Sequence, residues 1–398
     1  MATDRLYYAQ QTLQSFDATV LRTEVRGDDL AVWLDRTAFY PTSGGQPHDF
    51  GTLGGLPIVS VDDDEAGDVV HLVRGTTLAT GAVVQGDIDW RRRHDHMQQH
   101  TGQHLLSAVI ERAHGAKTIS FHLGTESSTI DIDRELTPSQ LAEIERAANR
   151  VVWDDVPVSV RTVSEDEARA LPLRKESART GALRLVNITG VDLSACGGTH
   201  VERTGGIGQL ALEGWERFKG GQRLSFLCGA RALARFQQLR DMSAASVRLL
   251  SVLPADLPSA IERLQSEVKD LKRTLTAVQA DLAVHEAGAL AEAADAAPFG
   301  RLVLRAIDGD AARLKALASA VVTRPGMLAV FVSTSMPALA VAGRSADVHV
   351  PCHDLIGSLA RQFGGRGGGK PDLAQCGGLQ AASDDLRAAV RAFLSTLA

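Results

Sequence analysis

"HMQQHTGQH", residues 96–104, lies in the first third of a 398-residue chain and brings three histidines into nine residues. The apolar residues that follow it, at 105–110, have the spacing of a helix. Residues four apart on a helix share one face, so His100 and His104 can both reach one ion. His96 lies about 12 Å from His104 along a helix that rises about 1.5 Å per residue, and is expected beside the site or at the surface. The stretch therefore predicts a helix that carries half of a metal site.

The other half is predicted in "CGGTH", residues 196–200. Cys196 and His200 are four apart around two glycines, which let both side chains turn toward one point. Three imidazoles and a thiolate suit tetrahedral zinc, and they do not suit magnesium or calcium. The pair of motifs is far more specific than HxxxH alone. We predict a zinc ion held by His100, His104, Cys196 and His200, and the sequence leaves open whether it is purely structural.

Thr101 argues against one familiar zinc chemistry. Metalloproteases of the HExxH type place a glutamate, their general base, directly after the first histidine. This chain has Thr101 there, so peptide hydrolysis is not expected.

Composition predicts a globular protein without a general attraction to polyanions. The length predicts two or three domains, and the formal net charge is −6. Nucleic-acid contacts would need local basic clusters, for which 91–93 and the group Arg361, Arg366 and Lys370 are candidates. Four widely spaced cysteines, no long apolar run and no leader-like N-terminus predict a cytoplasmic protein without a membrane span.

The patterns along the chain predict an α+β fold in four parts. Residues 1–90 alternate apolar and polar positions between glycines, which predicts a small β-barrel domain. Residues 91–235 predict an α+β core with the zinc site. Residues 236–297 predict a helical or coiled-coil linker, and residues 298–398 predict a small glycine-rich α/β domain.

One helix in the core has clear start signals. Thr137 is the expected N-cap and Pro138 the first turn, and Leu141, Ile144 and Ala148 fall on one face.

A heptad seam dominates the predicted linker. Its spacings alternate between four and three residues over Leu257, Ile261, Leu264, Val268, Leu271, Leu275, Val278 and Leu282. This pattern predicts one long helix in a coiled coil or helical hairpin. A single amphipathic helix lying on its own domain is the alternative.

Four motifs along the chain resemble one protein family. HTGQH, CGGTH and the preceding "FYPTSGGQPHDFG", residues 39–51, resemble the editing domain of alanyl-tRNA synthetases and the free-standing alanyl-tRNA editing proteins (the AlaX family). "GGRGGGKPDLAQCGG", residues 364–378, resembles the signature of the synthetase's C-terminal domain. With the heptad helix between them, the chain resembles the long form of the family.

The resemblance implies an activity and partners. It implies zinc-dependent hydrolysis of the ester in tRNA(Ala) mischarged with serine, and with glycine, while Ala-tRNA(Ala) is spared. Only about ninety residues precede the histidine helix, so aminoacylation is not expected. A homodimer is expected from the heptad seam and the C-terminal domain. The alternatives are a tRNA-binding protein with a purely structural zinc, and a zinc-dependent hydrolase of another ester.

The resemblance also implies functional residues outside the zinc site. Gln46, Thr37 and Thr42 are catalytic candidates that would line the editing site. The glycine-dense segment would act as a loop that brings backbone N–H groups and cations to tRNA phosphates. Its candidates are Arg366, Gly367, Gly368, Gly369 and Lys370.

Overall fold

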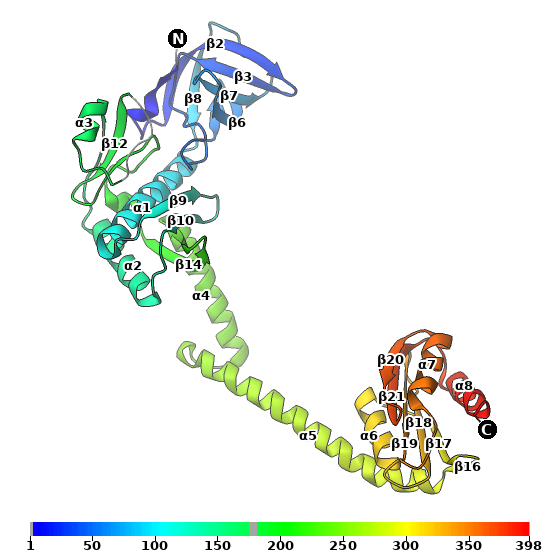
Figure 1. The fold of residues 1–398 in the computed structure, drawn as a ribbon. Coiled ribbons are helices and arrows are strands. Elements are labelled where there is room, and N and C mark those ends of the chain that lie inside the picture. Colours follow the sequence, from blue (N-terminus) through cyan, green and yellow to red (C-terminus); the bar gives the residue numbers. More distant parts are fainter. Residues whose placement is uncertain (1–2, 175–180, 398) are drawn as a thin grey trace. The chain divides into compact units, whose positions relative to one another are not determined.

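The computed structural model describes residues 3–174 and 181–397 (Figure 1). The predicted parts 1–90, 91–235 and 298–398 each include a few residues outside those ranges. The chain divides into two compact units, Met1–Ala245 and Ser246–Ala398. The predicted mixed α+β class is confirmed, and the bounds of the four predicted parts remain predictions.

Six antiparallel strands close into a barrel in the first unit, as the alternating pattern predicts. Around the barrel they run β2 (Ser15–Arg26), β3 (Asp29–Leu34), β7 (Val69–Arg74), β6 (Leu56–Asp63), β5 (Gly51–Leu53) and β8 (Val83–Ile88). The interior holds the alternating residues of β3, Leu30, Val32 and Leu34. Two short strands, β1 (Asp4–Arg5) and β4 (Arg36–Thr37), pair beside it, next to the 3-10 turn η1 (Leu6–Tyr8).

Two antiparallel sheets and two long helices form the rest of this unit. The four-stranded sheet has the order β14 (Leu210–Phe218), β15 (Gly221–Cys228), β10 (Ser128–Ile132) and β9 (Thr118–Leu123). The three-stranded sheet has the order β11 (Val158–Val163), β12 (Leu183–Ile188) and β13 (Asp192–Ala195). The helical segments are α1 (Trp90–His114), α2 (Pro138–Trp153), α3 (Glu165–Arg169) and η2 (Thr204–Ile207).

Helix α1 carries HMQQHTGQH and has clear ends. The side chain of Asp89 caps its first turn by accepting from Arg92 N, and Gly115 ends it in the left-handed conformation. Gly102 is required because a Cβ there would lie 2.3 Å from Cys228 Sγ. This helix face is therefore pressed against strand β15.

Helix α2 begins as predicted. Thr137 is the N-cap in a capping box with Gln140, and Pro138 is in the first turn. Leu141, Ile144 and Ala148 are buried in the core that α1 and α2 share with the sheets.

The expectation that residues 91–93 form a surface basic cluster is wrong for Arg93. Its side chain is fully buried and paired with the buried carboxylate of Asp49. It also donates to Gln11 O at 2.8 Å and Ala38 O at 2.5 Å. Arg93 therefore fastens the start of α1 to the barrel domain.

The second unit is a sheet with helices on both faces. Helix α4 (Ala230–Leu250) crosses the boundary between the units, and η3 (Pro254–Asp256) leads into α5 (Leu257–Glu292). The sheet has the order β16 (Asp295–Ala297), β17 (Gly300–Ile307), β18 (Met327–Ser333), β19 (Ala338–Arg344), β21 (Leu373–Leu379) and β20 (Arg366–Gly369). The C-terminal end of α5 and α6 (Ala311–Val321) pack on one face, and α7 (Cys352–Phe363) and α8 (Ser383–Ser395) on the other (Figure 1).

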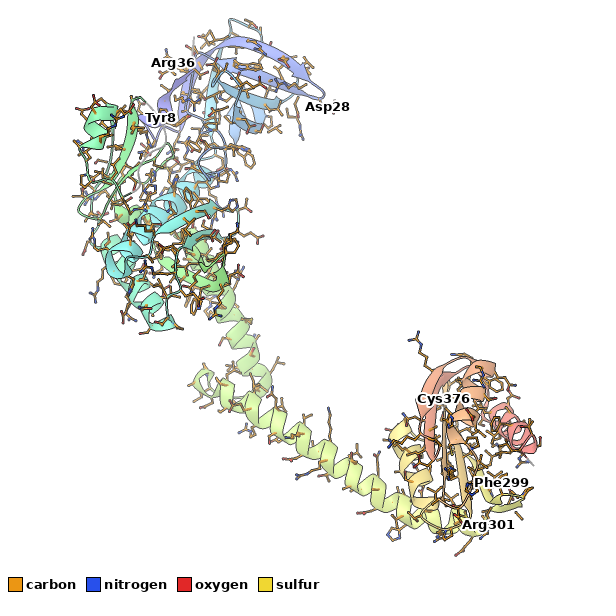
Figure 2. All side chains as sticks on the ribbon, in the orientation of Figure 1. Tyr8, Asp28, Arg36, Phe299, Arg301 and Cys376 are labelled. Atoms are coloured by element: carbon orange, nitrogen blue, oxygen red, sulfur yellow. The ribbon has the colours of Figure 1, made fainter. Side chains whose placement is uncertain are left out.

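The predicted glycine-rich loop is in fact a β-hairpin, formed by β20 and β21. Gly367 lies opposite Cys376, and a Cβ on Gly367 would come 2.3 Å from the Cβ of Cys376. Cys376, labelled in Figure 2, is buried in this sheet. Glycine is needed here because the two strands approach too closely for a side chain.

Across the described ranges, no single helix has the length and apolarity to cross a membrane. Helices α4 and α5 satisfy that test only when they are taken together across the break between them.

Candidate metal centre and its pocket

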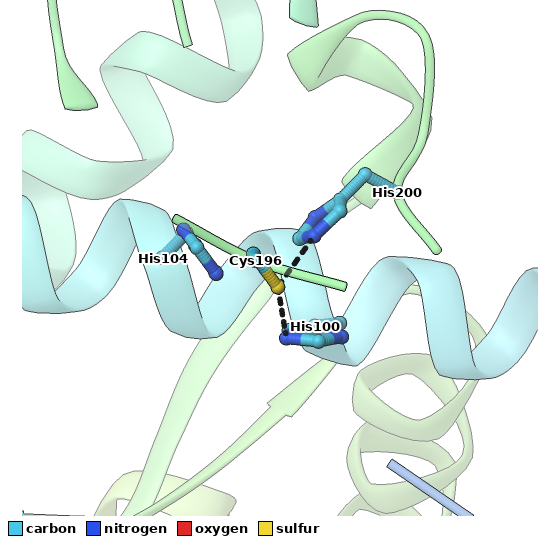
Figure 3. A group of neighbouring side chains, drawn as sticks. All are labelled: His100, His104, Cys196 and His200. Carbon is cyan, nitrogen blue, oxygen red and sulfur yellow. Dashed lines mark hydrogen bonds between the residues drawn. The ribbon is translucent and has the colours of Figure 1, made fainter. Parts of the chain in front are cut away.

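The four predicted ligands meet at one point in the first unit. His100 and His104 project from α1, and Cys196 and His200 reach them from the segment after β13 (Figure 3). Their ligand atoms all lie within 4.8 Å of one another. His100, His104 and His200 are buried, and Cys196 is partly exposed. The pairing of the two motifs is therefore a property of the fold, while the metal itself remains a prediction.

Two of the six separations between ligand atoms match those around a small tetrahedral ion. Zinc bonds of about 2.0–2.3 Å place neighbouring ligand atoms roughly 3.3–3.6 Å apart. Cys196 Sγ lies 3.4 Å from His100 Nε2 and 3.4 Å from His200 Nε2. Thiolate and imidazole are also the donors that zinc prefers. Geometry and chemistry of the donor set thus agree.

Each histidine is held by a different outer partner at its Nδ1 atom. His104 Nδ1 lies 2.9 Å from Asp192 Oδ2, and His100 Nδ1 lies 2.8 Å from Gln46 Oε1. His200 Nδ1 lies 3.2 Å from Thr101 Oγ1, whose own hydroxyl donates to Met97 O.

These partners determine which nitrogen of each ring carries the proton and which is left to bind a metal. Carboxylate and amide oxygens only accept, and the Thr101 hydroxyl has already donated its proton, so each Nδ1 carries a proton and donates it. The Nε2 atom of each ring is then left to face the cluster. Such outer contacts are the usual way in which a protein orients histidine ligands to a metal.

Asp192 is the most strongly connected of these partners. Its buried carboxylate also accepts from Arg174 Nε at 2.6 Å and from Ser194 Oγ at 3.0 Å. Burial opposes its ionisation, but the hydrogen bond and charge of His104 outweigh burial and lower the pKa of Asp192 to about 2. Burial likewise opposes protonation of His104, but the hydrogen bonds to Asp192 and Cys196 raise the pKa of His104 to about 9. Zinc binding there would release a proton from the chain.

The other two groups are tuned toward metal binding. Burial alone would raise the pKa of the Cys196 thiol, but the charges of His100 and His200 hold it well below its usual value. Burial, with repulsion from His100, lowers the pKa of His200 to about 3. A thiolate and a neutral imidazole are the forms that bind zinc.

The CGGTH turn is fixed from both sides. A Cβ on Gly198 would lie 2.1 Å from His100 Cε1, so only glycine lets this turn lie against the ring. Arg184 donates to Cys196 O at 2.7 Å and to Gly198 O at 2.8 Å. Gln11 Oε1 accepts from Arg184 and, at 2.7 Å, from His200 N. Backbone contacts therefore hold the turn without using the side chains of Cys196 and His200.

A pocket of about 540 Å³ reaches the cluster at His104 and Cys196. That volume is within the range of small-molecule sites. Tyr8, labelled in Figure 2, lines it, as do Arg174 and Arg184. Among the lining residues within 3–174 and 181–397 there are two arginines and no carboxylate. Arg174 is paired with Asp192, and Arg184 donates to the carbonyl oxygens of Cys196 and Gly198, so both cations already have protein partners.

The predicted catalytic residues lie in three different places. Gln46 follows the tight Ser43–Gln46 turn and is fully buried, where it accepts from Thr199 N and orients His100. Thr37 is fully buried and lies 2.7 Å from His71 Nε2. Thr42 is exposed and lies 2.9 Å from His48 Nδ1. None of the three is among the residues that line the pocket, and their catalytic roles remain predictions.

His96 does not join the cluster, as the helix geometry predicts, but it is buried rather than at the surface. Burial lowers the pKa of His96 to about 4.

The predicted tRNA-binding residues form one exposed group in the second unit. Arg366 through Gly369 make strand β20, and Lys370 follows it. All five are exposed. Their role in binding tRNA remains a prediction.

Sequence reasoning missed several residues around the cluster. Gln11, Arg174 and Arg184 come from segments without a recognisable motif, and nothing in the sequence links them to the zinc ligands. Gln103 was missed although it stands directly before His104 in HTGQH. That adjacency to a ligand was the one available signal.

Comparison with known proteins agrees with this architecture. The "Threonyl and Alanyl tRNA synthetase second additional domain" matches residues 183–225, and the "DHHA1 domain" matches residues 300–396. The alanine–tRNA ligase of Methanoregula boonei is 34% identical over 404 residues, covering 96% of this chain and 42% of the ligase. The ligase of Pyrococcus abyssi is 33% identical over 390 residues, covering 94% and 42%. The chain thus spans about two fifths of the length of these ligases.

Two further proteins are similar to this chain. A solved structure, the C-Ala domain of Aquifex aeolicus alanyl-tRNA synthetase, is 25% identical and covers 25% of this chain and 91% of that domain, with a TM-score of 0.23. The alanyl-tRNA editing protein Aarsd1-A of Xenopus laevis is 34% identical over 302 residues, covering 75% of this chain and 72% of the Xenopus protein. With two matching domains and a relative covered over most of its length, this chain belongs to the family of alanyl-tRNA editing proteins.

Proposed function

We propose that this protein hydrolyses the ester bond of tRNA(Ala) mischarged with serine, and with glycine, and that His100, His104, Cys196 and His200 hold a zinc ion that this activity requires. The observation that carries the proposal is the orientation of all three imidazoles, each with Nδ1 held outside the cluster and Nε2 turned into it. The name of the Xenopus relative, an alanyl-tRNA editing protein, supports the substrate.

The chemistry of the pocket is consistent with an aminoacylated tRNA end. Zinc, when bound, supplies positive charge that polarises an ester carbonyl or lowers the pKa of a water. Arg174 and Arg184 line the pocket that the 3′ end of the tRNA would enter. The surrounding partners, Asp192, Gln46 and Thr101, hold the rings in place.

Serine is the expected error because a pocket built for alanine rejects one extra hydroxyl poorly. Such a pocket discriminates by only about a hundredfold, so a second site has to remove the product.

The test is a deacylation panel on Ser-tRNA(Ala), Gly-tRNA(Ala) and Ala-tRNA(Ala). The wild-type protein should release serine and glycine and spare alanine, and removal of zinc or the change His104→Ala should abolish this activity. His122→Ala is the matched control because His122 is exposed and lies outside the cluster. Full activity in His104→Ala would remove zinc from the chemistry. Hydrolysis of none of the three tRNAs would instead favour a tRNA-binding protein or a hydrolase of another ester.

We propose further that Arg366, Lys370 and the three glycines between them bind tRNA phosphates. The support is an exposed strand with two cations and no side chain to keep a phosphate from the backbone. The double change R366E and K370E should weaken tRNA binding and reduce the salt slope by about 2, because each phosphate contact contributes about 0.9. Lys315→Glu, on exposed Lys315 in α6, should leave the slope unchanged.

We propose a parallel homodimer through the heptad seam of α5. Seven of the eight seam residues are 43–69% exposed, namely Ile261, Leu264, Val268, Leu271, Leu275, Val278 and Leu282. Ile261 and Val268 fall at position a, with Leu264 and Leu271 at position d, and these heptads have the pattern that favours a parallel two-stranded coiled coil. Further along the seam the pattern is reversed, with Leu275 and Leu282 at a and Val278 at d.

The charged residues beside the seam support the same parallel arrangement of two helices. Glu267 at position g of one helix would face Lys272 at position e of the partner copy. E267K should therefore weaken the dimer in sedimentation equilibrium, and adding K272E should restore it. Equal masses for all three proteins, at the monomer value, would contradict the dimer.

A further inference from the structure

Among the residues that the structure describes, only the NH2 half of the Gln103 amide has a hydrogen-bond partner. The residue stands next to His104 on α1, is 3% exposed and lines the pocket. Its Nε2 donates to Ser107 Oγ at 2.8 Å, and Thr118 Oγ1 donates to the same oxygen at 2.8 Å. These bonds fix the amide plane.

In the part of the chain that the structure describes, no donor reaches the Oε1 atom of Gln103. Within the described residues, the one hydrogen bond of this side chain is made by Nε2. Oε1 is also absent from the fully enclosed polar atoms that have no partner, so it keeps its access to the pocket. A buried side chain thus presents one fixed acceptor at the position where the pocket meets a ligand of the metal centre. Few, well-placed polar groups of this kind give small-molecule sites their specificity.

Two serine hydroxyls of the pocket have committed their protons to internal acceptors. Ser120 Oγ donates to Asp131 Oδ2, and Ser194 Oγ donates to Asp192. Both residues line the same pocket. The amide oxygen of Gln103 is therefore held in place beside His104, and no donor among the described residues binds it.

We propose that Gln103 is a specificity-determining residue whose Oε1 accepts the hydroxyl proton of the seryl group. This inference rests on the proposed deacylation of Ser-tRNA(Ala). Alanyl and glycyl groups have no hydroxyl, so they leave Oε1 without this bond. A single neutral hydrogen bond corresponds to a preference of up to about tenfold for the seryl group.

The test compares two non-hydrolysable ligands, adenosine carrying serine or alanine in amide linkage at its 3′ position. Their Kd values are measured by calorimetry on the zinc-loaded full chain. The wild-type protein should bind the seryl compound about tenfold more tightly. Gln103→Met, which keeps the length of the side chain but removes the acceptor, should abolish that preference and leave the Kd of the alanyl compound unchanged.

Two further variants separate recognition from loss of structure. Gln103→Glu keeps an acceptor at the same reach and should keep the preference. Gln98→Met makes the control change on the same helix, at a buried glutamine that bonds Gly206 O and does not line the pocket. It should behave like the wild type.

The inference is overturned if the wild type shows no seryl preference, if it binds neither compound, or if Gln103→Met keeps the preference. Because these are binding measurements, they are read separately from turnover. A protein that prefers the seryl compound but fails to deacylate Ser-tRNA(Ala) would contradict the proposed hydrolysis and leave the recognition by Gln103 standing.

Discussion

Replacing Asp192 with asparagine should weaken zinc binding without removing a ligand. In the structure the two carboxylate oxygens are divided between two cations: Oδ2 accepts from His104 Nδ1 at 2.9 Å and Oδ1 from Arg174 Nε at 2.6 Å. Asparagine has one acceptor oxygen and one NH2 group. Asp192→Asn therefore leaves either His104 or Arg174 facing a donor, and it removes the negative charge that makes His104 a strong ligand.

The magnitude follows from the kind of contact that is lost. Outer partners of histidine ligands typically change metal affinity by about 10–100-fold, or about 1.4–2.7 kcal/mol. We expect the upper half of that range, because the carboxylate is almost fully buried. The three other ligands remain, so binding should weaken and not disappear.

Competition with a chromophoric zinc chelator gives the affinity directly. Asp95→Asn is the matched control, since Asp95 is also paired with an arginine, Arg231, at 2.6 Å and touches none of the four ligands. Urea unfolding of the metal-free proteins checks that both variants are folded. Our account of the site is refuted if folded Asp192→Asn keeps zinc affinity within about threefold of the control.

Three other changes test separate features of the first unit. Gly198→Ala puts a Cβ 2.1 Å from the His100 ring, so zinc affinity in the chelator assay should fall at least about tenfold; an unchanged affinity would mean the turn can move aside. Asp49→Ala leaves Arg93 buried without its charge partner and should lower the free energy of unfolding in urea by about 3–5 kcal/mol; a loss under about 1 kcal/mol would show that water reaches Arg93. Burial lowers the pKa of His71 to about 4. Between about pH 6.5 and 4, His71 is therefore protonated in the unfolded chain but not in the folded protein. The free energy of unfolding should decrease by roughly 3 kcal/mol as the pH is lowered from 6.5 to 4. His71→Gln should flatten that part of the pH profile, and an unchanged slope would assign it to other groups.

The sequence predicted the parts of the fold that have a local signal. The alternation of apolar and polar residues in 1–90 is enough to predict the barrel. Each strand buries every second side chain, and this period of two is visible in the sequence. The capping box at Thr137 and the heptads of α5 (Leu257–Glu292) are likewise contained in short segments. The sequence does not reveal the β20–β21 hairpin, because glycine has no side chain with which to mark the two faces of a strand.

The site divides in the same way. The pairing of HTGQH with CGGTH was predictable because each motif carries two ligands at a fixed spacing. Contacts such as His104–Asp192 and Arg93–Asp49 join residues that are 88 and 44 positions apart in the sequence. A periodic pattern describes only neighbouring residues and cannot predict contacts of this kind. Burial hid Arg93 for a related reason: a run of three arginines suggests a solvated surface unless the partner carboxylate is known.

The outer partners of the three histidines link the cluster to the wider fold. Gln46 follows a turn of the barrel domain, Thr101 lies on α1 and Asp192 begins β13, so no single element determines the orientation of all three rings. The cluster can take its arrangement only when the barrel, the helix and the three-stranded sheet are all in place. A protein that binds zinc with such partners couples the ion to its folded state, because binding to the native form alone raises stability. The two short motifs supply the four donor atoms of the predicted zinc site. The surrounding elements of the first unit set the tautomer and the orientation of the three rings, which is why so small a site needs a unit of more than two hundred residues.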